Sequence, residues 1–401
     1  MLEFQGVKKG SKLPTVLIIG MGDTGVLVAA HLRRNCRVIA VTTRPVLLSG
    51  QELGKRLTDL SYWKKSYLTP LDAFRKLDDV ECIHGKVIAV NTDEQVVSIE
   101  CSDQSTQSVC WDYLVIASGI SNGFWRTAQV ENVADVESDL ERQTSTIVSA
   151  KRIAVMGGGP SGTSVAFNVA SRFPDKDVTL FFSGDDVLPG YHPKTRTYHM
   201  AKLREAGVTL KPGHRADPST DGTRTALKGG VVTFSSGQPD YIGDALIWAT
   251  GAVHPNTAFL PLDMLDEAGF IKTEKTMTVI GYSNVFAIGD AAATDPLRSS
   301  ARNWAYRILC RNINALIQGK APAHRFQPPG SRWGSVLGLQ SNGLTLHQQN
   351  GGRHRLPVWF VQLILWPWIV TRGIYGGIRK CASRRKDASR RQSFNGPNND
   401  G

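Results

Sequence analysis

Two glycine-rich turns about 140 residues apart constrain the fold of this chain more than any other feature. The first turn is the segment 20–25 (GMGDTG) and the second turn is the segment 157–162 (GGGPSG). Each follows a short apolar run that is typical of a buried strand and precedes a segment with a helical apolar face. Further apolar runs, 37–42 and 178–182, complete a strand-helix-strand unit at each turn. The sequence therefore predicts a duplicated βαβ unit.

The spacing of the glycines indicates what the two turns bind. In such a turn the first glycine permits the sharp change of direction, the second lets the backbone approach a pyrophosphate, and the third lets helix pack on strand. The helix N-terminus adds N–H donors and partial positive charge. The sequence thus predicts two dinucleotide sites, whose glycines are Gly20, Gly22 and Gly25 in the first and Gly157, Gly159 and Gly162 in the second.

Both predicted sites lack the acidic residue that usually ends the second strand and binds the ribose hydroxyls. Thr42 and Phe182 stand at those positions. Thr42 offers one hydroxyl, with Arg44 nearby to stack or pair, whereas Phe182 offers neither charge nor hydrogen bond. The second site therefore has no carboxylate to repel a 2′-phosphate, and the choice between NADH and NADPH stays open.

Three more segments end apolar strands with characteristic turns. They are 112–119 (DYLVIASG), 244–251 (DALIWATG) and 285–292 (VFAIGDAA). Other predicted elements are alternating strands at 86–100 and 109–117 around a loop at 102–108, a strand at 278–280, and a helix over 298–318. These turns contain Ser118, Gly119, Gly251, Gly289, Asp290 and Ala291.

The order of these motifs resembles the pyridine nucleotide-disulfide oxidoreductase superfamily. Over residues 14–345 the chain is similar to apoptosis-inducing-factor-like and ferroptosis suppressor flavoproteins, and to type II NADH dehydrogenases. Matching stretches include 173–180 (FPDKDVTL), 281–290 (GYSNVFAIGD) and 326–329 (FQPP). The resemblance implies FAD at the first turn, NAD(P)H at the second, and a membrane quinone as electron acceptor. It also implies that Ser118, Gly119, Gly251, Gly289, Asp290 and Ala291 contact the cofactors.

The resemblance also implies an α/β fold with two Rossmann-like dinucleotide-binding domains and a small C-terminal domain. The FAD-binding domain would be split by the inserted NAD(P)H-binding domain. The predicted division is 14–121 and 246–322 for the FAD-binding domain, 122–245 for the NAD(P)H-binding domain, 323–355 for a C-terminal module, and 356–401 for a membrane-contact segment with a basic tail.

By the same resemblance, Asp290 binds the ribityl chain or its phosphate. Ala291 and a helix directly after it direct N–H groups at the pyrimidine edge of the flavin. Family members often carry Glu two residues after the last glycine of the second turn, where it orders the nicotinamide, but this chain has Ser164. The cofactors carry the redox chemistry, so the sequence predicts no catalytic side chain.

The cysteines argue against a dithiol mechanism. Six cysteines occur without any CxxC or CxxxxC pair or metal-ligand spacing, so a cysteine relay, a disulfide scaffold and a zinc site are not expected. Cys101, Cys110 and Cys310 are interpreted as structural residues. His254 follows the ATG turn, where it is either a turn residue or a proton donor to the reduced acceptor.

The C-terminal region carries most of the excess charge. The net charge is +12, and residues 353–401 contain ten Lys or Arg against two Asp. The body is therefore nearly neutral, and no nucleic acid is expected as a partner. Residues 356–371 hold sixteen residues without a charge, which is short of a bilayer span, and a basic run follows over 379–391.

Interfacial tryptophans and basic residues together predict contact with a membrane surface through 356–391. The alternative is a buried closing helix followed by a basic tail. The N-terminus lacks the apolar core of a secretory signal. A cytoplasmic protein with peripheral membrane association is therefore expected, and the oligomeric state stays open.

Three functions are compatible with these features. The main hypothesis is an FAD-dependent NAD(P)H:quinone oxidoreductase. One alternative is a soluble NAD(P)H reductase for an iron-sulfur carrier protein, docked through the basic tail. The other is a redox-signalling flavoprotein with slow turnover, which Thr42, Phe182 and Ser164 would favour.

Overall fold

The larger of the two sheets that contain the glycine-rich turns is seven-stranded and holds the first turn. A computed structural model describes residues 13–121, 129–217, 227–250, 253–298 and 304–379. The strand order is β17-β8-β1-β2-β5-β6-β7. Neighbours from β17 to β5 are parallel, and β5, β6 and β7 pair antiparallel. The strands are β1 (Thr15–Ile19), β2 (Arg37–Thr42), β5 (Val80–Asn91), β6 (Val96–Cys101), β7 (Thr106–Cys110), β8 (Tyr113–Ile116) and β17 (Val285–Ala287).

The smaller sheet contains the second turn. It is four-stranded and wholly parallel, in the order β12-β11-β10-β15. Its strands are β10 (Arg152–Met156), β11 (Asp177–Phe181), β12 (Thr209–Lys211) and β15 (Ala245–Trp248). Parallel strands covered on both faces are built from continuous apolar runs, and every residue of β1 and β15 is buried. The duplicated βαβ units predicted from the sequence are thus confirmed.

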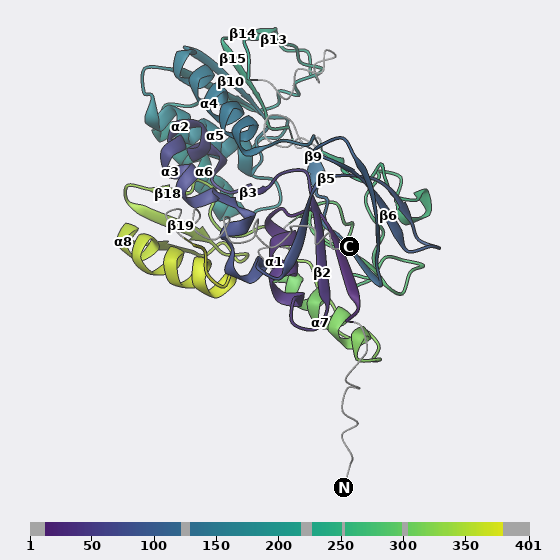
Figure 1. The fold of residues 1–401 in the computed structure, drawn as a ribbon. Coiled ribbons are helices and arrows are strands. Elements are labelled where there is room, and N and C mark those ends of the chain that lie inside the picture. Colours follow the sequence, from purple (N-terminus) through teal and green to yellow (C-terminus); the bar gives the residue numbers. More distant parts are fainter. Residues whose placement is uncertain (1–12, 122–128, 218–226, 251–252, 299–303, 380–401) are drawn as a thin grey trace, which may run out of the picture.

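Helices and short strands cover and connect the two sheets (Figure 1). The helices are α1 (Asp23–Leu32), α2 (Leu53–Thr58), α3 (Leu60–Tyr67), α4 (Val133–Ser149), α5 (Pro160–Arg172), α6 (Pro193–Glu205) and α7 (Ala305–Ile317), with 3₁₀ turns η1 (Leu71–Ala73), η2 (Arg75–Leu77) and η5 (Leu262–Met264). The short strands are β3 (Val46–Leu48), β4 (Leu68–Pro70), β9 (Ile120–Ser121), β13 (Gly230–Val232), β14 (Tyr241–Gly243) and β16 (His254–Pro255).

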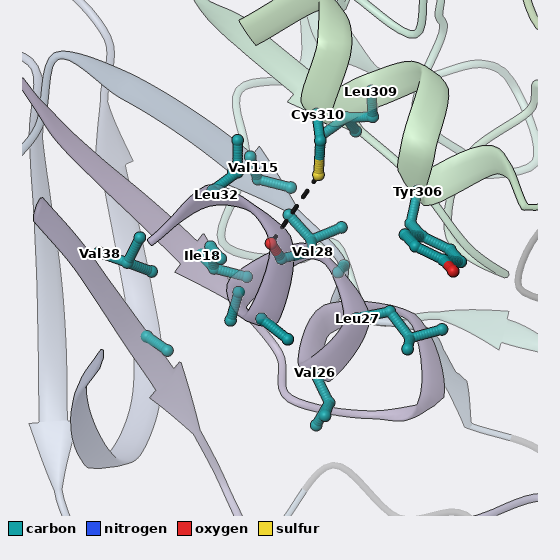
Figure 2. Close-up of a cluster of buried hydrophobic side chains, with 14 of the residues drawn as sticks. Ile18, Val26, Leu27, Val28, Leu32, Val38, Val115, Tyr306, Leu309 and Cys310 are labelled. Carbon is teal, nitrogen blue, oxygen red and sulfur yellow. Dashed lines mark hydrogen bonds between the residues drawn. The ribbon is translucent and has the colours of Figure 1, made fainter. Parts of the chain in front are cut away.

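Helix α1 is held between the larger sheet and α7. Figure 2 shows Val28 and Leu32 of α1 beside Leu309 and Cys310 of α7. The Cys310 thiol lies 3.8 Å from the Val28 carbonyl oxygen, and burial raises the pKa of this thiol. This packing fixes the helix whose N-terminus faces the first turn.

The structure corrects the predicted strands around residue 100. The alternating run 86–100 is broken by a turn, because the Asn91 side-chain oxygen accepts hydrogen bonds from the backbone of Asp93 and Glu94. The run 109–117 is also two strands: its first residues end β7, and its last residues form β8 in the parallel part of the sheet. Alternation alone did not reveal these breaks, since polar residues recur on both sides of them.

Two other predicted elements differ. Residues 278–280 make only single bridges, to Phe286 and Thr273, and form no strand. The predicted helix directly after Ala291 is absent, because residues 291–298 are turns in which the Asp295 side chain accepts from the Leu297 backbone. Helix α7 begins only at Ala305, so the predicted helix start at 298 is several residues too early.

The C-terminal region forms a small sheet and an apolar helix. The sheet contains β18 (Leu339–Gln340), β19 (Gly343–His347) and β20 (Arg353–Leu356). Helix α8 (Val358–Phe360) continues as the π-helix η6 (Val361–Ile374), drawn in yellow beside α3 and β18 in Figure 1. Among the described helices, none is both long enough and apolar enough to cross a bilayer.

One face of this C-terminal helix packs on the body and the other is exposed. Trp366 contacts the Tyr67 ring of α3 at 5.0 Å between centroids, and Tyr375 contacts Phe74. By contrast, Leu363 and Trp368 are 66% and 59% exposed. The predicted alternative of a buried closing helix therefore does not describe the outer face of this segment.

Candidate functional site

The first glycine of each turn packs on a second predicted motif. Gly20 and Gly157 have positive φ angles of 98° and 116°. A Cβ on Gly20 would stand 2.4 Å from the Ala117 oxygen, and one on Gly157 would stand 2.1 Å from the Ala249 oxygen. Only glycine fits such a backbone and such a contact. Each glycine-rich turn is thus joined to the A-S-G or A-T-G turn of its own sheet.

The second glycine of each turn borders open space. Gly22 and Gly159 are the N-caps of α1 and α5, and no side chain caps either helix. A Cβ at either position would meet no atom within 4 Å. The backbone N–H groups in the first turns of both helices therefore remain available to an anion, except at Pro160, which has no N–H. The third glycines, Gly25 and Gly162, are buried in the first turns of α1 and α5.

Ser118 and Gly119 lie next to the first turn. The Ser118 hydroxyl is shielded from solvent and has no hydrogen-bond partner among the described residues. Gly119 has a φ of 68°, and no atom lies within 4 Å of its Cβ position. Asn256, which the sequence did not single out, donates to the Ser118 carbonyl oxygen at 3.1 Å. Gly251, the corresponding predicted residue of the second site, lies outside the described residues.

The third of the predicted turn segments, 285–292, lies near the first glycine-rich turn. A Cβ on Gly289 would stand 3.4 Å from the Thr24 hydroxyl oxygen in the first turn of α1. Asp290 is half-buried next to it, and Ala291 is fully buried. Gly289 therefore lies beside the first turn of α1, and the role of 289–291 in a shared cofactor site stays a prediction.

The end of β2 carries a carboxylate that the sequence did not reveal. The Thr42 hydroxyl donates to the Arg44 carbonyl oxygen at 2.9 Å, so a local turn uses it. The Arg44 guanidinium pairs with Glu131 at 2.5 Å, and the Glu131 backbone donates to Thr43. An acidic group thus lies at the strand end after all, contributed by a residue 89 positions away from Thr42 in the chain.

The end of β11 is apolar, as its sequence indicates. Phe182 is buried, and a Cβ on Gly158 would stand 2.9 Å from the Phe182 Cβ, so the ring packs behind the second turn. Ser164 is also buried, and its hydroxyl has no partner among the described residues. A Cβ on Gly54 of α2 would stand 2.3 Å from the Ser164 carbonyl oxygen. Helices α2 and α5 therefore touch backbone to backbone beside the nicotinamide position predicted for this site.

The remaining singled-out residues do not gather at either turn. Cys110 is exposed on β7, Cys101 is partly buried on β6, and both are free thiols. His254 is exposed on β16, where it pairs with Ser121 of β9. No group of three or more His, Cys, Asp or Glu in the described part of the chain could hold a metal ion.

Two sheets, each with parallel strands around a glycine turn that leads into an uncapped helix, define a dinucleotide-binding α/β protein with two sites. The family model described as pyridine nucleotide-disulphide oxidoreductase matches residues 14–308. The chain belongs to this family. It is an oxidoreductase that uses FAD and NAD(P)H.

Several curated proteins are similar to this chain. Fe-regulated protein 8 of Mycosarcoma maydis is 29% identical over 64% of this chain and 66% of its own length. Apoptosis-inducing factor homolog A of Dictyostelium discoideum is 24% identical over 81% and 84% of the two chains. Ferroptosis suppressor protein 1 of Xenopus tropicalis is 24% identical over 76% and 82%. These similarities confirm the relationship that the motifs indicated.

Solved structures share the fold. The water-forming NADH oxidase from Lactobacillus brevis superposes with a TM-score of 0.62 and 19% identity, over 83% of this chain and 74% of that one. NDH2 from Plasmodium falciparum superposes with a TM-score of 0.56 and 15% identity, over 70% and 65%. The predicted fold, with two Rossmann-like units, is thereby confirmed.

Proposed function

We propose that this protein is an FAD-dependent NAD(P)H:quinone oxidoreductase that works at a membrane surface. The observation that carries the proposal is the C-terminal helix, whose inner face packs on the FAD-side sheet region and whose outer face exposes Trp359, Leu363 and Trp368. Exposed apolar residues gathered on one helix mark a surface for a membrane or a partner. A quinone acceptor resides in the membrane, so the exposed helix and the acceptor inferred from the resemblance agree.

The first turn would hold FAD. The backbone N–H groups at Gly22 would bind the pyrophosphate, while Asp290 would bind the ribityl chain. Ser118 would contribute its unused hydroxyl, and Arg44 with Glu131 would border the adenosine ribose. When bound, the flavin supplies hydride acceptance and onward electron transfer. The protein's part is to orient the cofactor and to place positive helix ends near its phosphates.

The second turn would hold NAD(P)H. The N–H groups at Gly159 would bind the pyrophosphate, and the α2–α5 contact at Gly54 and Ser164 would border the nicotinamide. Neither β11 nor the buried Phe182 offers a group that selects for or against a 2′-phosphate. The domain division 14–121, 122–245, 246–322 and 323–355 stays a prediction, as does the role of each site residue.

The C-terminal helix would lie in the membrane interface. Its tryptophans suit the headgroup region. Arg372 at the end of the helix adds positive charge, and the basic run that follows lies outside the described residues except for Arg379. Each basic residue near an anionic surface contributes about 1 kcal/mol. The association would be peripheral, because the apolar helix is too short to span the bilayer.

One experiment tests this function. The visible spectrum of the purified protein is recorded, and oxidation of NADH and of NADPH by a short-chain ubiquinone is then measured with and without anionic liposomes. We expect a flavin spectrum and quinone-dependent turnover that rises on liposomes. A flavin spectrum with ferricyanide turnover but no quinone turnover would contradict the quinone assignment.

A carrier protein is the second candidate acceptor. Burial lowers the pKa of Lys76, and the positive charges of Arg33, Arg34 and Arg307 lower it further. Such a basic cluster suits an acidic iron-sulfur protein. Turnover with ferredoxin that falls steeply with salt, in place of turnover with quinone, would favour this candidate. Bound flavin with neither activity would favour a signalling role.

A further inference from the structure

Glu52 occupies an unusual position between the first turn and the C-terminal helix. It is the residue before α2 and has left-handed backbone angles, with φ 49° and ψ 45°. A non-glycine residue rarely adopts this conformation without surrounding structure that holds it there. The carboxyl is held from one side by Leu339 of β18, whose N–H donates to Oε1 at 3.0 Å.

The second carboxyl oxygen is left without a partner. Oε2 is shielded from solvent and makes no hydrogen bond among the described residues. Gly338 lies directly against the carboxyl, since a Cβ there would stand 2.8 Å from the Glu52 Cδ. A shielded, unpaired carboxylate oxygen is costly, whereas a protonated carboxyl avoids burying the charge. The geometry therefore favours the neutral acid.

The charged and hydrogen-bonding groups around Glu52 oppose the neutral state, but burial outweighs them. Burial raises the pKa of Glu52 and is the largest effect. The Leu339 N–H, the Tyr67 and Tyr62 hydroxyls, and the nearby Lys55 ammonium lower that pKa. The net direction is upward, so Glu52 keeps its proton at a higher pH than an ordinary glutamate does.

On one side Glu52 adjoins the first turn. Two residues before it, the Gly50 N–H donates to an Asp23 carboxylate oxygen at 3.1 Å, and the Ser49 hydroxyl donates to the other at 2.7 Å. Asp23 is the first residue of α1, directly after Gly22. The loop that ends at Glu52 is thus tied to the proposed FAD site.

On the other side Glu52 lies one aromatic layer beneath the C-terminal helix. Tyr67 contacts Trp366 of that helix. Tyr62 packs in one apolar cluster with Leu339, Val361 and Leu365. The path from Glu52 to the exposed outer face therefore passes through two tyrosines and then the helix that we propose to lie in the membrane.

We propose that Glu52 is a proton donor for quinone reduction, with Tyr62 and Tyr67 as the residues that position its carboxyl. The inference rests on the proposed quinone function. Reduction of a quinone to its hydroquinone takes two electrons and two protons. The hydride from NAD(P)H accounts for both electrons and one proton. The second proton leaves the Glu52 carboxyl as the hydroquinone O–H forms, and solvent then reprotonates the carboxylate.

Glu52→Gln tests the proposal, because glutamine keeps the size and the acceptor for Leu339 but carries no transferable proton. We expect turnover with ubiquinone to fall at least about tenfold. Turnover with ferricyanide, which accepts electrons without protons, should stay within about twofold. Glu81→Gln, which removes an exposed carboxylate paired with Arg37, should change neither rate. Equal losses with both acceptors, or an unchanged quinone rate, would overturn the proposal.

Two further readouts separate proton donation from a structural role. Below the pH at which the quinone rate declines, infrared spectra should contain a protonated-carboxyl band in the wild type that is missing in Glu52→Gln. The wild-type quinone rate should also decline as rising pH deprotonates Glu52. Tyr62→Phe removes a group that lowers this pKa, so the decline should move to higher pH, which provides a test even if Glu52→Gln fails to fold. An unmoved decline, or no carboxyl band, would count against the role.

The same experiment distinguishes the two proposals. A wild-type protein that reduces ferricyanide but no quinone would refute the proposed function itself. A wild-type protein that reduces quinone as fast as its Glu52→Gln variant would leave the proposed function standing and refute only the role of Glu52.

Discussion

The carbonyl oxygen of Gly20 lies only 1.9 Å from the position that a Cβ on Gly25 would occupy. The second turn repeats this relationship, with the Gly157 oxygen 1.9 Å from the Cβ position of Gly162. Each turn can therefore pack this closely against its own helix only because its third glycine has no side chain. The repeated distance makes the two sites geometrically equivalent, although their sequences share little besides glycine.

Substitution of either third glycine should disable one site and spare the other. Gly162→Ala forces the turn away from its helix, so NAD(P)H affinity should fall at least about tenfold while bound flavin is retained. Gly25→Ala should instead lower flavin content. Gly330→Ala is the control, because no atom lies within 4 Å of that Cβ position. Flavin spectra and nicotinamide titrations measure both effects, and loss of both cofactors from either variant would contradict the assignment of separate sites.

Glu131→Gln should weaken FAD binding. The Arg44–Glu131 pair is largely buried, with side-chain exposures of 17% and 22%, and the variant removes the carboxylate at the strand end where a ribose hydroxyl needs an acceptor. The dissociation constant for FAD, measured by fluorescence titration of apoprotein, should rise about tenfold. NAD(P)H affinity should not change. An unaltered FAD affinity would mean that Glu131 only orients Arg44.

The double variant Leu363→Ser and Trp368→Ser should detach the protein from liposomes. Each side chain is mostly exposed, so the fold loses little, whereas membrane burial of each contributes about 1.5–3 kcal/mol. Liposome affinity, measured by co-sedimentation, should fall at least about tenfold. Leu262→Ser removes another exposed leucine, on η5, and serves as the matched control. Equal liposome binding by the wild type, the double variant and Leu262→Ser would exclude this helix as the membrane contact.

The free energy of unfolding should decrease as the pH falls from about 6.5 to about 4. His199 is 1% exposed and lines a cavity of about 270 Å³ between α5, α6 and β18–β19. Burial lowers its pKa from 6.5 to about 4. The unfolded chain thus takes up a proton across this window while the folded protein does not, so the free energy of unfolding decreases as pH falls, by up to about 3 kcal/mol. Above pH 6.5 this effect vanishes.

His199→Leu tests the origin of that pH dependence. Leucine removes the titrating group, so the free energy of unfolding, measured by denaturant titration at pH 7 and pH 4.5, should differ less between the two pH values than in the wild type. His254, which is exposed, provides a control through His254→Gln. An identical pH dependence in His199→Leu and in the wild type would assign the effect to other groups.

Local patterns predicted the parts of this fold that depend on short segments. The βαβ units around Gly20 and Gly157 were predictable because buried parallel strands need continuous apolar runs and the turns need glycine at fixed spacing. The break at Asn91 was missed because a side-chain hydrogen bond to the next residues, and not hydrophobicity, ends β5. The start of α7 was missed because an amphipathic pattern continues on both sides of a helix end.

The sequence by itself determined the duplicated dinucleotide fold, the membership of an FAD- and NAD(P)H-dependent family, and a charge-free apolar segment near the C-terminus. Only the tertiary structure decided that Glu131 lies at the end of β2, that Glu52 is shielded beneath Tyr62 and Tyr67, and that Leu363 and Trp368 face outward. The physical reason is the range of the interactions. Glycine turns and buried strands are specified within a few residues, whereas an ion pair or a shielded carboxyl depends on segments that meet only when the chain folds.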